Sequence, residues 1–149
     1  MACDGNEPDQ DQPRPDGGVT DETTGYRPAL GPQTAMTPFR HILYDVWLED
    51  AQILERVEPM REMMLEAARR SKALILDSYF HQFDPHGVTG VVLIAQSHLS
   101  IHTWSEDAYA AIDLFTYSHM DPDAAISYIR EQLRPVRERL TDLTRGRAP

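Results

Sequence analysis

The chain has 149 residues, a length typical of one domain with a single core of modest size. Its 24 acidic residues against 14 basic ones give a formal net charge of −10. A chain of this charge repels phosphate backbones and anionic lipid, so neither nucleic acid nor a membrane surface is an expected partner. The single cysteine, Cys3, excludes a disulfide framework and a cysteine-rich zinc site. No apolar run approaches the roughly 20 residues that cross a bilayer, and we expect a cytoplasmic protein.

The first 38 residues differ in composition from the rest of the chain. They hold six of the 11 prolines, five of the eight glycines, and seven acidic residues against two arginines. Such a composition buries too little apolar surface to offset the entropy cost of ordering. We therefore predict a disordered acidic tail over residues 1–38, followed by the functional domain over residues 39–149.

The domain is predicted to begin with a strand and a helix. Residues 41–48 are rich in β-branched, aromatic and aliphatic side chains, as strands are. Asp50 is expected to cap a helix that Pro59 kinks or restarts. The apolar stripe of this helix falls at intervals of three and four residues, at Ile53, Val57, Met60, Met64 and Ala68.

The middle of the chain is predicted to form four strands. Residues 73–76 and 88–95 are short apolar runs separated by a turn at residues 84–87, so we expect neighbouring strands. Residues 99–103 alternate apolar and polar side chains, and residues 109–116 form a further strand. Together these segments build the sheet.

A second amphipathic helix is predicted near the C-terminus. Asp121 and Pro122 are its expected N-cap and first turn, and Pro135 interrupts it. Its apolar stripe consists of Ile126, Ile129 and Leu133. The order strand, helix, four strands, helix predicts an α+β domain, an antiparallel sheet with helices on one face.

Polar residues gather at one place in the predicted sheet, flanked by apolar strands. They are Gln96, Ser97, His98, Ser100, His102, Thr103, Ser105 and Glu106. A scaffold with such a polar centre is a candidate site. Chemistry alone leaves three interpretations open: a metal site, a serine hydrolase, and the hydrated face of an antiparallel sheet with no catalytic role.

The metal interpretation would use His98 and His102, with His81, His86 or Glu106 completing the shell. Residues four positions apart share a face of a strand but stand ~13 Å apart when the strand is extended. Two ligands of one ion cannot lie that far apart, so the spacing counts against a metal.

The hydrolase interpretation would use Ser97 as nucleophile, His102 as base and Asp113 as the orienting acid. Glycines do not flank Ser97, so nothing local forces the strained turn that exposes such a serine. Spacing alone therefore does not support a hydrolase.

A longer pattern resembles a known family. The segment GVTGVVLIAQSHLSIHTW over residues 87–104, followed by Glu106 and by YAAIDLFT over residues 109–116, resembles the processing and active-site region of prokaryotic S-adenosylmethionine decarboxylase proenzymes. The resemblance extends back through His81-Gln82-Phe83 and Arg40-His41 and forward through Asp121-Pro122. It covers roughly residues 39–134 and leaves the predicted tail outside.

The resemblance implies self-cleavage between Gln96 and Ser97 into chains of residues 1–96 and 97–149. In the family the serine hydroxyl attacks the preceding carbonyl to form an ester, and β-elimination leaves a dehydroalanine that hydrolyses to a covalent pyruvoyl cofactor. His102 falls at the family's processing histidine, a residue type suited to proton transfer near neutrality. A bend or bulge in the strand must then bring Ser97 and His102 together.

The same resemblance implies a substrate and a partner. The pyruvoyl group accepts electrons as carbon dioxide leaves S-adenosylmethionine, so neither a bound coenzyme nor a metal is required. Phe83 and Glu106 stand where the family stacks on adenine and binds the ribose hydroxyls. The product supplies aminopropyl groups for spermidine biosynthesis, and processed protomers are expected to form a homodimer, an αββα sandwich.

Three positions depart from the family pattern. Gln96 replaces a glutamate, Ser105 replaces a proline and is expected to alter turn stiffness only, and Tyr117 replaces the cysteine that donates a proton to the product. Tyrosine is a larger side chain and a weaker acid than cysteine. Tyr44 and Asp84, expected to border the cavity, add bulk and negative charge. Two alternatives follow: a pyruvoyl-dependent decarboxylase of arginine or ornithine, and an inactive regulatory paralogue.

Overall fold

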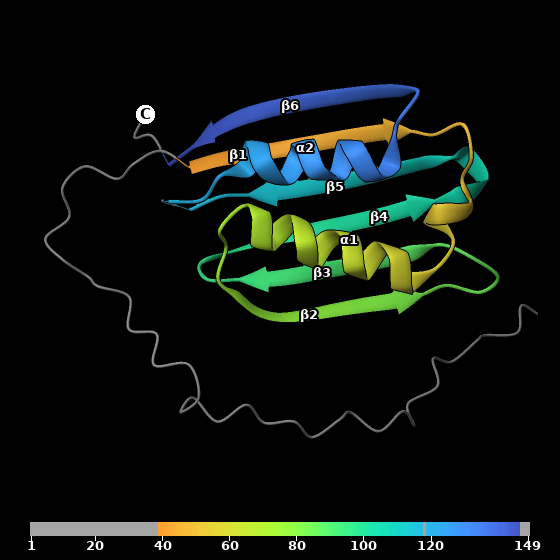
Figure 1. Cartoon of the computed structure of the whole chain (residues 1–149), viewed down its shortest axis with the longest axis horizontal. Coiled ribbons are helices and arrows are strands. Elements are labelled where there is room, and N and C mark those ends of the chain that lie inside the picture. Colours follow the sequence, from red (N-terminus) through yellow and green to blue (C-terminus); the bar gives the residue numbers. More distant parts are fainter. Residues whose placement is uncertain (1–38, 118, 147–149) are drawn as a thin grey trace, which may run out of the picture. The chain divides into compact units, whose positions relative to one another are not determined.

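The computed structural model describes residues 39–117 and 119–146, which form a six-stranded antiparallel sheet with two helices on one face (Figure 1). The strands are β1 (Phe39–Trp47), β2 (Ile75–Gln82), β3 (Val88–Ile94), β4 (Ser97–Trp104), β5 (Tyr109–Phe115) and β6 (Arg137–Arg145). The helices are α1 (Val57–Arg70) and α2 (Pro122–Leu133), with short 3-10 turns η1 (Gln52–Leu54) and η2 (Ser105–Asp107). The predicted α+β class is confirmed, whereas the predicted acidic tail lies outside the described residues.

The strand order is β2-β3-β4-β5-β1-β6, so β1 is inserted between β5 and β6. The strands β2 to β5 pair consecutively, which confirms that β2 and β3 are neighbours. The edges of the sheet are β2 and β6. Over the described part of the chain, no helix has both the length and the apolar character needed to span a membrane.

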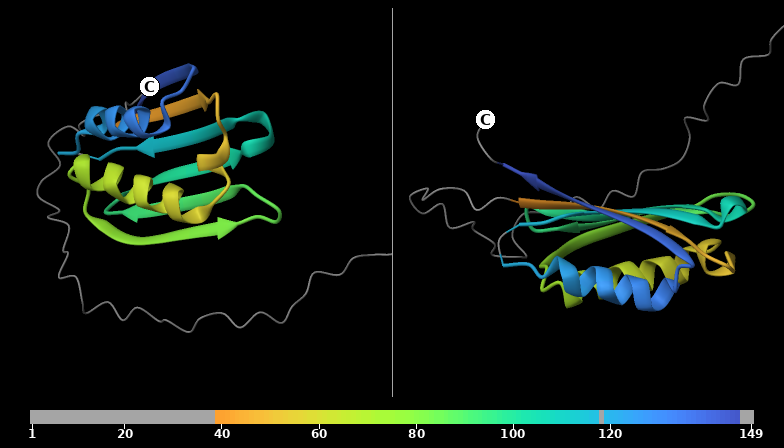
Figure 2. Two further views of the ribbon diagram at one scale, coloured as in Figure 1. Left: turned by 45° about the vertical axis from the view of Figure 1, so that its right-hand side comes forward. Right: turned by 90° about the horizontal axis from the view of Figure 1, so that it is seen from above.

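The core lies between the helices and one face of the sheet (Figure 2). Along β1, β4 and β5 alternate residues are buried, because successive side chains of a strand leave opposite faces. The buried sheet residues include Ile42, Leu99, Ile101, Ile112 and Leu114, and they meet Met60 and Met64 of α1 and Ile126 and Ile129 of α2. Burying each of the larger side chains contributes about 1.5–3 kcal/mol. The opposite face of the sheet carries no helix.

The first helix begins later than predicted. Asp50 accepts a hydrogen bond from the Gln52 amide at 3.0 Å, but only the 3-10 turn η1 follows it. The helix α1 begins at Val57, whose amide donates to the side-chain oxygen of Gln82 at 3.0 Å. Pro59 lies in the first turn of α1, where its missing N–H removes no helical bond, so α1 runs from Val57 to Arg70 through this proline without the expected restart.

The second helix matches its prediction closely. Asp121 accepts a hydrogen bond from the Ala124 amide at 3.1 Å, and Pro122 is the first helical residue. The helix ends at Leu133, and Arg134 follows in the left-handed conformation with φ +46°. A left-handed residue commonly closes a helix because its amide satisfies a late carbonyl.

The edge strand β6 was not predicted. Only two of its nine residues, both leucines, are apolar, so its own sequence carries no strand alternation. It pairs with β1 along its whole length. The ion pair Arg40–Asp142 at 2.8 Å adds to this pairing, and the ion pair Arg130–Glu138 at 2.9 Å joins β6 to α2. Neighbouring elements therefore determine this strand.

Gly90 of β3 allows a close approach to the neighbouring strand. It is the register partner of Phe80 on β2. A Cβ atom at position 90 would lie 2.1 Å from a ring carbon of Phe80. The phenyl ring thus occupies the space that any side chain at position 90 would need.

Gly90→Ala should therefore lower the free energy of unfolding by about 1–3 kcal/mol, because the ring must leave its packed position. Urea denaturation followed by far-UV circular dichroism measures the change, recorded on a Ser97→Ala background that cannot cleave itself at this serine. In a Phe80→Ala background the same substitution should cost much less, since the ring is gone. An equal penalty in both backgrounds would show that the clash is not its cause.

The uncovered face carries a row of aromatic side chains beside an acidic residue. The ring of Tyr109 on β5 lies 5.1 Å from that of Trp47 and 5.4 Å from that of Trp104, between centroids. Its hydroxyl donates to Asp45 at 2.5 Å. Burial and, after it, the hydrogen bond to Asp45 together raise the pKa of Tyr109 to about 12. Tyr109 is thus neutral at physiological pH.

Asp45→Asn should lower the pKa of Tyr109 from about 12 towards ~10, because it removes the negative charge beside the hydroxyl while burial remains. The two tryptophans of the chain both contact Tyr109, so tryptophan fluorescence during an alkaline titration reports the phenolate. Because the folded pKa exceeds the unfolded one, this tyrosine stabilises the fold below about pH 10, and the contribution fades as pH rises to about 12. Identical midpoints in the two proteins would contradict the assignment.

Candidate active site

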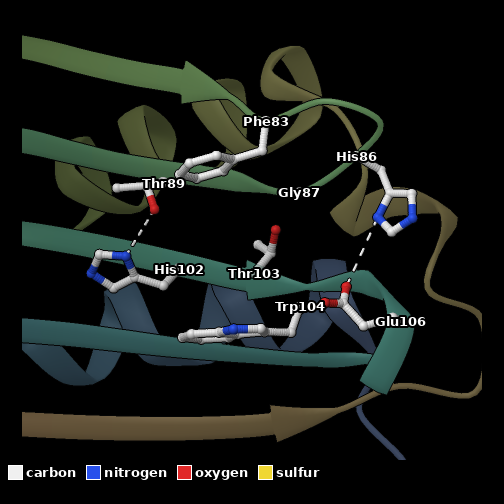
Figure 3. Close-up of a pocket in the computed structure, with 8 residues that line it drawn as sticks. All are labelled: Phe83, His86, Gly87, Thr89, His102, Thr103, Trp104 and Glu106. Carbon is white, nitrogen blue, oxygen red and sulfur yellow. Dashed lines mark hydrogen bonds and ion pairs between the residues drawn. The ribbon is translucent and has the colours of Figure 1, made fainter. Parts of the chain in front are cut away.

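A pocket of about 320 Å³ opens on the uncovered face, between β3, β4 and the loops that follow β2 and β4 (Figure 3). It is lined by Phe83, His86, Gly87, Thr89, His102, Thr103, Trp104 and Glu106. The rings of Phe83 and Trp104 lie on opposite sides of the pocket, and each is nearly half exposed. The volume lies at the lower end of the roughly 300–1,000 Å³ range of small-molecule sites.

The side chain of Gln82 holds the loop that carries Phe83 and His86. Its amide nitrogen donates to the carbonyls of Glu55 at 2.8 Å and Gly87 at 3.0 Å, and its oxygen caps α1 as described above. Gly87 adopts φ +104°, a conformation that glycine reaches at no steric cost. One partly buried side-chain amide therefore connects the start of α1 to the rim of the pocket.

His102 is held at the floor of the pocket by Thr89. The two residues are register partners on β4 and β3, and Nδ1 of His102 lies 3.0 Å from the threonine hydroxyl. This bond fixes the ring plane and turns Nε2 away from Thr89. The imidazole is thus oriented for proton transfer at its other nitrogen.

A second polar group lies at the mouth of the pocket. The Ser105 hydroxyl is 2.5 Å from Nδ1 of His86, and the same nitrogen is 3.9 Å from a Glu106 carboxylate oxygen. Ser105 is buried, whereas the carboxylate of Glu106 is exposed to solvent. Ser105 therefore positions His86, which is more than the change in turn stiffness expected from the sequence.

Ser97 lies at the beginning of β4, directly after the two-residue turn that joins it to β3. Gln96 in this turn has φ +64°, a conformation that costs an ordinary residue about 1–2 kcal/mol. Ser97 is buried, and its hydroxyl donates to the carbonyl of Phe115 on β5. The Gln96–Ser97 bond thus follows a strained residue and precedes a fixed hydroxyl.

The predicted bend between Ser97 and His102 is absent from β4. Pairing with β3 and β5 continues along the strand without a bulge. Five residues of extended strand separate the two residues by about 16 Å. Because five is an odd number, their side chains also leave opposite faces of the sheet. The expectation that they meet within one chain is wrong for the uncleaved structure.

Tyr117 and Tyr44 both lie outside the pocket. The hydroxyl of Tyr117 accepts a hydrogen bond from the Leu74 amide at 3.2 Å, and its ring packs against the core. Tyr44, expected to border the cavity, lies on the helix-covered face and donates its hydroxyl proton to Glu138. Burial raises the pKa of Tyr44 further above its ordinary value than that of Tyr109. Only Phe83, Glu106 and His102 of the predicted site share the pocket.

The hydrolase and metal interpretations find no support in the geometry. Asp113 faces His41 at 3.5 Å, whereas His102 contacts Thr89. Among residues 39–117 and 119–146, no three histidine, cysteine, aspartate or glutamate side chains lie close enough to share a metal ion.

Thr89 and Trp104 are site residues that the sequence did not identify. Trp104 follows His102 by two positions, so strand alternation was a signal for placing both on one face. Thr89 had no local signal, because its contact with His102 depends on the register between β3 and β4.

Comparison with known proteins places the chain in a family. The family described as S-adenosylmethionine decarboxylase matches residues 40–146. The S-adenosylmethionine decarboxylase proenzyme of Thermosipho africanus is 43% identical over 109 residues, which cover 72% of this chain and 84% of that protein. The proenzyme of a Geobacillus species is 40% identical over 110 residues, covering 74% of this chain and 89% of that one.

A solved structure shows the same fold. The crystal structure of the adenosylmethionine decarboxylase from Aquifex aeolicus aligns with a TM-score of 0.70 and 40% sequence identity. The alignment covers 77% of this chain and 96% of that one. The chain therefore belongs to the S-adenosylmethionine decarboxylase family.

Proposed function

We propose that this protein is a self-processing S-adenosylmethionine decarboxylase whose pyruvoyl group is made from Ser97. The observation that carries the proposal is the position of Ser97, directly after a left-handed Gln96, in a chain of this family. Such an enzyme supplies decarboxylated S-adenosylmethionine for spermidine biosynthesis. The same proposal places it in the cytoplasm, in keeping with its single cysteine.

The proposed cleavage begins with the hydroxyl of Ser97. Its oxygen attacks the carbonyl carbon of Gln96, the carbon–nitrogen bond breaks, and the Ser97 nitrogen takes the proton, which leaves an ester. A base then removes the Cα proton of Ser97, and the Cβ–O bond breaks. Gln96 departs as a new C-terminal carboxylate. The remaining dehydroalanine adds water and loses ammonia to give the pyruvoyl group.

Two features of the uncleaved chain support this route. The left-handed Gln96 stores strain that opening of the turn releases. The Phe115 carbonyl accepts from the Ser97 hydroxyl and so fixes the nucleophile next to the bond it attacks. Both features favour the first step.

The pocket residues suit the substrate. When formed, the pyruvoyl group serves as the electron sink for loss of carbon dioxide. Phe83 and Trp104 flank a space in which an adenine ring can stack, and Glu106 can accept from ribose hydroxyls. A pocket between two aromatic rings fits a purine better than it fits arginine or ornithine, so the alternative decarboxylase is less well supported.

Tyr117 remains our candidate for the proton donor to the product. It stands two residues after Phe115, whose carbonyl contacts Ser97, so it lies near the group that Ser97 becomes. Its bond with Leu74 uses the phenol oxygen as an acceptor, which leaves the phenol hydrogen for transfer.

We further propose that the partner is a second copy of the chain. The uncovered face exposes large apolar side chains, and a groove of about 210 Å³ there is lined in part by Tyr79, Val91 and Leu93. Two sheets that pack through these faces form an αββα sandwich. A two-fold axis then places the pocket of one protomer over the start of β4 in the other.

Such a dimer accounts for the separation of Ser97 from His102. The side chain of Ser97 projects from the helix-covered face, so its Cα–H bond is directed along the sheet and partly towards the uncovered face. His102 of a second copy approaches from that face and can remove this proton. The processing site is then assembled from two protomers.

Purified protein should consist of residues 1–96 and 97–149, the second chain blocked by pyruvoyl, and should release carbon dioxide from S-adenosylmethionine but not from arginine or ornithine. Intact-mass measurement and a labelled-carboxylate assay check both points. Ser97→Ala should stay whole and inactive. An uncut wild-type chain would refute self-processing, whereas a cut chain active only on arginine or ornithine would refute the substrate.

Co-expression of two variants should distinguish a processing site shared between protomers from a site formed within a single chain. His102→Ala and Ser97→Ala should each stay uncleaved when expressed alone. In a mixed dimer, the Ser97→Ala chain supplies the intact His102 and the His102→Ala chain supplies the intact Ser97. The His102→Ala chain should then be cut in up to about half of the molecules, the statistical share of mixed dimers. Intact-mass analysis with one chain tagged gives the result, and a His102→Ala chain that stays whole in the mixture would show that the base acts within its own chain.

A further inference from the structure

Tyr117 is connected to the scissile turn through backbone hydrogen bonds. Its phenol oxygen accepts from the amide of Leu74 at 3.2 Å. The carbonyl of Leu74 in turn accepts from the amide of Ala95 at 2.9 Å. Ala95 is the first residue of the two-residue turn and directly precedes Gln96. Two consecutive bonds thus lead from the tyrosine hydroxyl to the strained turn.

Ser97, on the C-terminal side of the scissile bond, contacts the segment of chain that carries Tyr117. The carbonyl of Phe115 accepts from the Ser97 hydroxyl, and Tyr117 follows two residues later. Residues 115–117 therefore hold the nucleophile through one contact and the outer edge of the turn through the other. In the sequence, Gln96 stands between Ala95 and Ser97, the two residues that these contacts hold.

We propose that Tyr117 is a positioning residue for self-cleavage, in addition to any role in the mature enzyme. By holding Leu74, it keeps the turn in the geometry in which the Gln96 carbonyl faces the Ser97 hydroxyl. Without the phenol oxygen the Leu74 amide lacks its acceptor, the segment relaxes, and the attack-ready geometry is populated less. This inference rests on the proposed self-processing.

The role is confined to the precursor. Cleavage separates Gln96 from Ser97, so the turn that Tyr117 braces no longer exists in the mature protein. Proton donation to the product, by contrast, matters only after cleavage. The cleavage rate of the full-length chain therefore measures the positioning role. Turnover per pyruvoyl group in the cleaved protein measures proton donation.

Tyr117→Phe removes the acceptor and keeps the packed ring. In cell-free synthesis followed by intact-mass analysis, its cleavage should be roughly tenfold slower than that of the wild type, the size of effect that loss of one positioning hydrogen bond supports. Tyr128→Phe is the matched control, because it removes a tyrosine hydroxyl from α2, and it should cleave at the wild-type rate. Melting temperatures recorded on Ser97→Ala backgrounds separate slow cleavage from loss of fold.

Hydroxylamine identifies the step that is affected, because it cuts the ester but not the amide. Shortly after synthesis, Tyr117→Phe should give little hydroxylamine-dependent cleavage, since less ester forms. His102→Ala should give more, since its ester forms and persists. Abundant ester in Tyr117→Phe, or cleavage at the wild-type rate, would overturn the positioning role and leave the proposed function intact. A wild-type chain that stays uncut would instead refute the proposed self-processing.

Discussion

The two helices cover only one face of the sheet, and the placement of the candidate site residues on β4 follows from this asymmetry. Alternation along β4 sends Leu99 and Ile101 into the core and His102 to the uncovered face, where the pocket forms. The same alternation gives Ser97 to the covered face. A strand that buries one row of side chains against the helices exposes the other row on the opposite face of the sheet. The polar side chains of β4 are therefore divided between the two faces.

The two ends of the β3–β4 hairpin carry different tasks in the proposed enzyme. At one end, the register between Thr89 and His102 fixes an imidazole beside two aromatic rings, an arrangement for binding and proton transfer. At the other end, a strained Gln96 is braced through Leu74 and Phe115. Local strain of this size persists only where surrounding hydrogen bonds hold it. In the proposed dimer, the pocket end of one hairpin lies over the turn end of the other, so the binding site of one protomer meets the cleavage site of its partner.

Sequence patterns predicted the parts of the fold that depend on local signals. Asp121 and Pro122 mark the start of α2, and the fold class followed from the order of the elements. The edge strand β6 escaped prediction because pairing with β1, rather than its own side chains, makes it a strand. Phe83 and Glu106, which the resemblance assigns to substrate binding, line one pocket, whereas the bend or bulge expected between Ser97 and His102 is absent. Sequence spacing measures separation along one chain and is silent on contacts supplied by a second.

The insertion of β1 between β5 and β6 has a consequence for the lifetime of the protein. A cut at Ser97 leaves β1 to β3 on one fragment and β4 to β6 on the other, so the two fragments are interlaced by strand pairing rather than merely adjacent. They should stay together without a covalent link. After unfolding, however, reassembly requires two separate chains to meet, and if Ser97 has become the pyruvoyl group as proposed, no serine remains to make it again. In the proposed enzyme, self-cleavage therefore leaves two paired fragments whose unfolding is in practice irreversible.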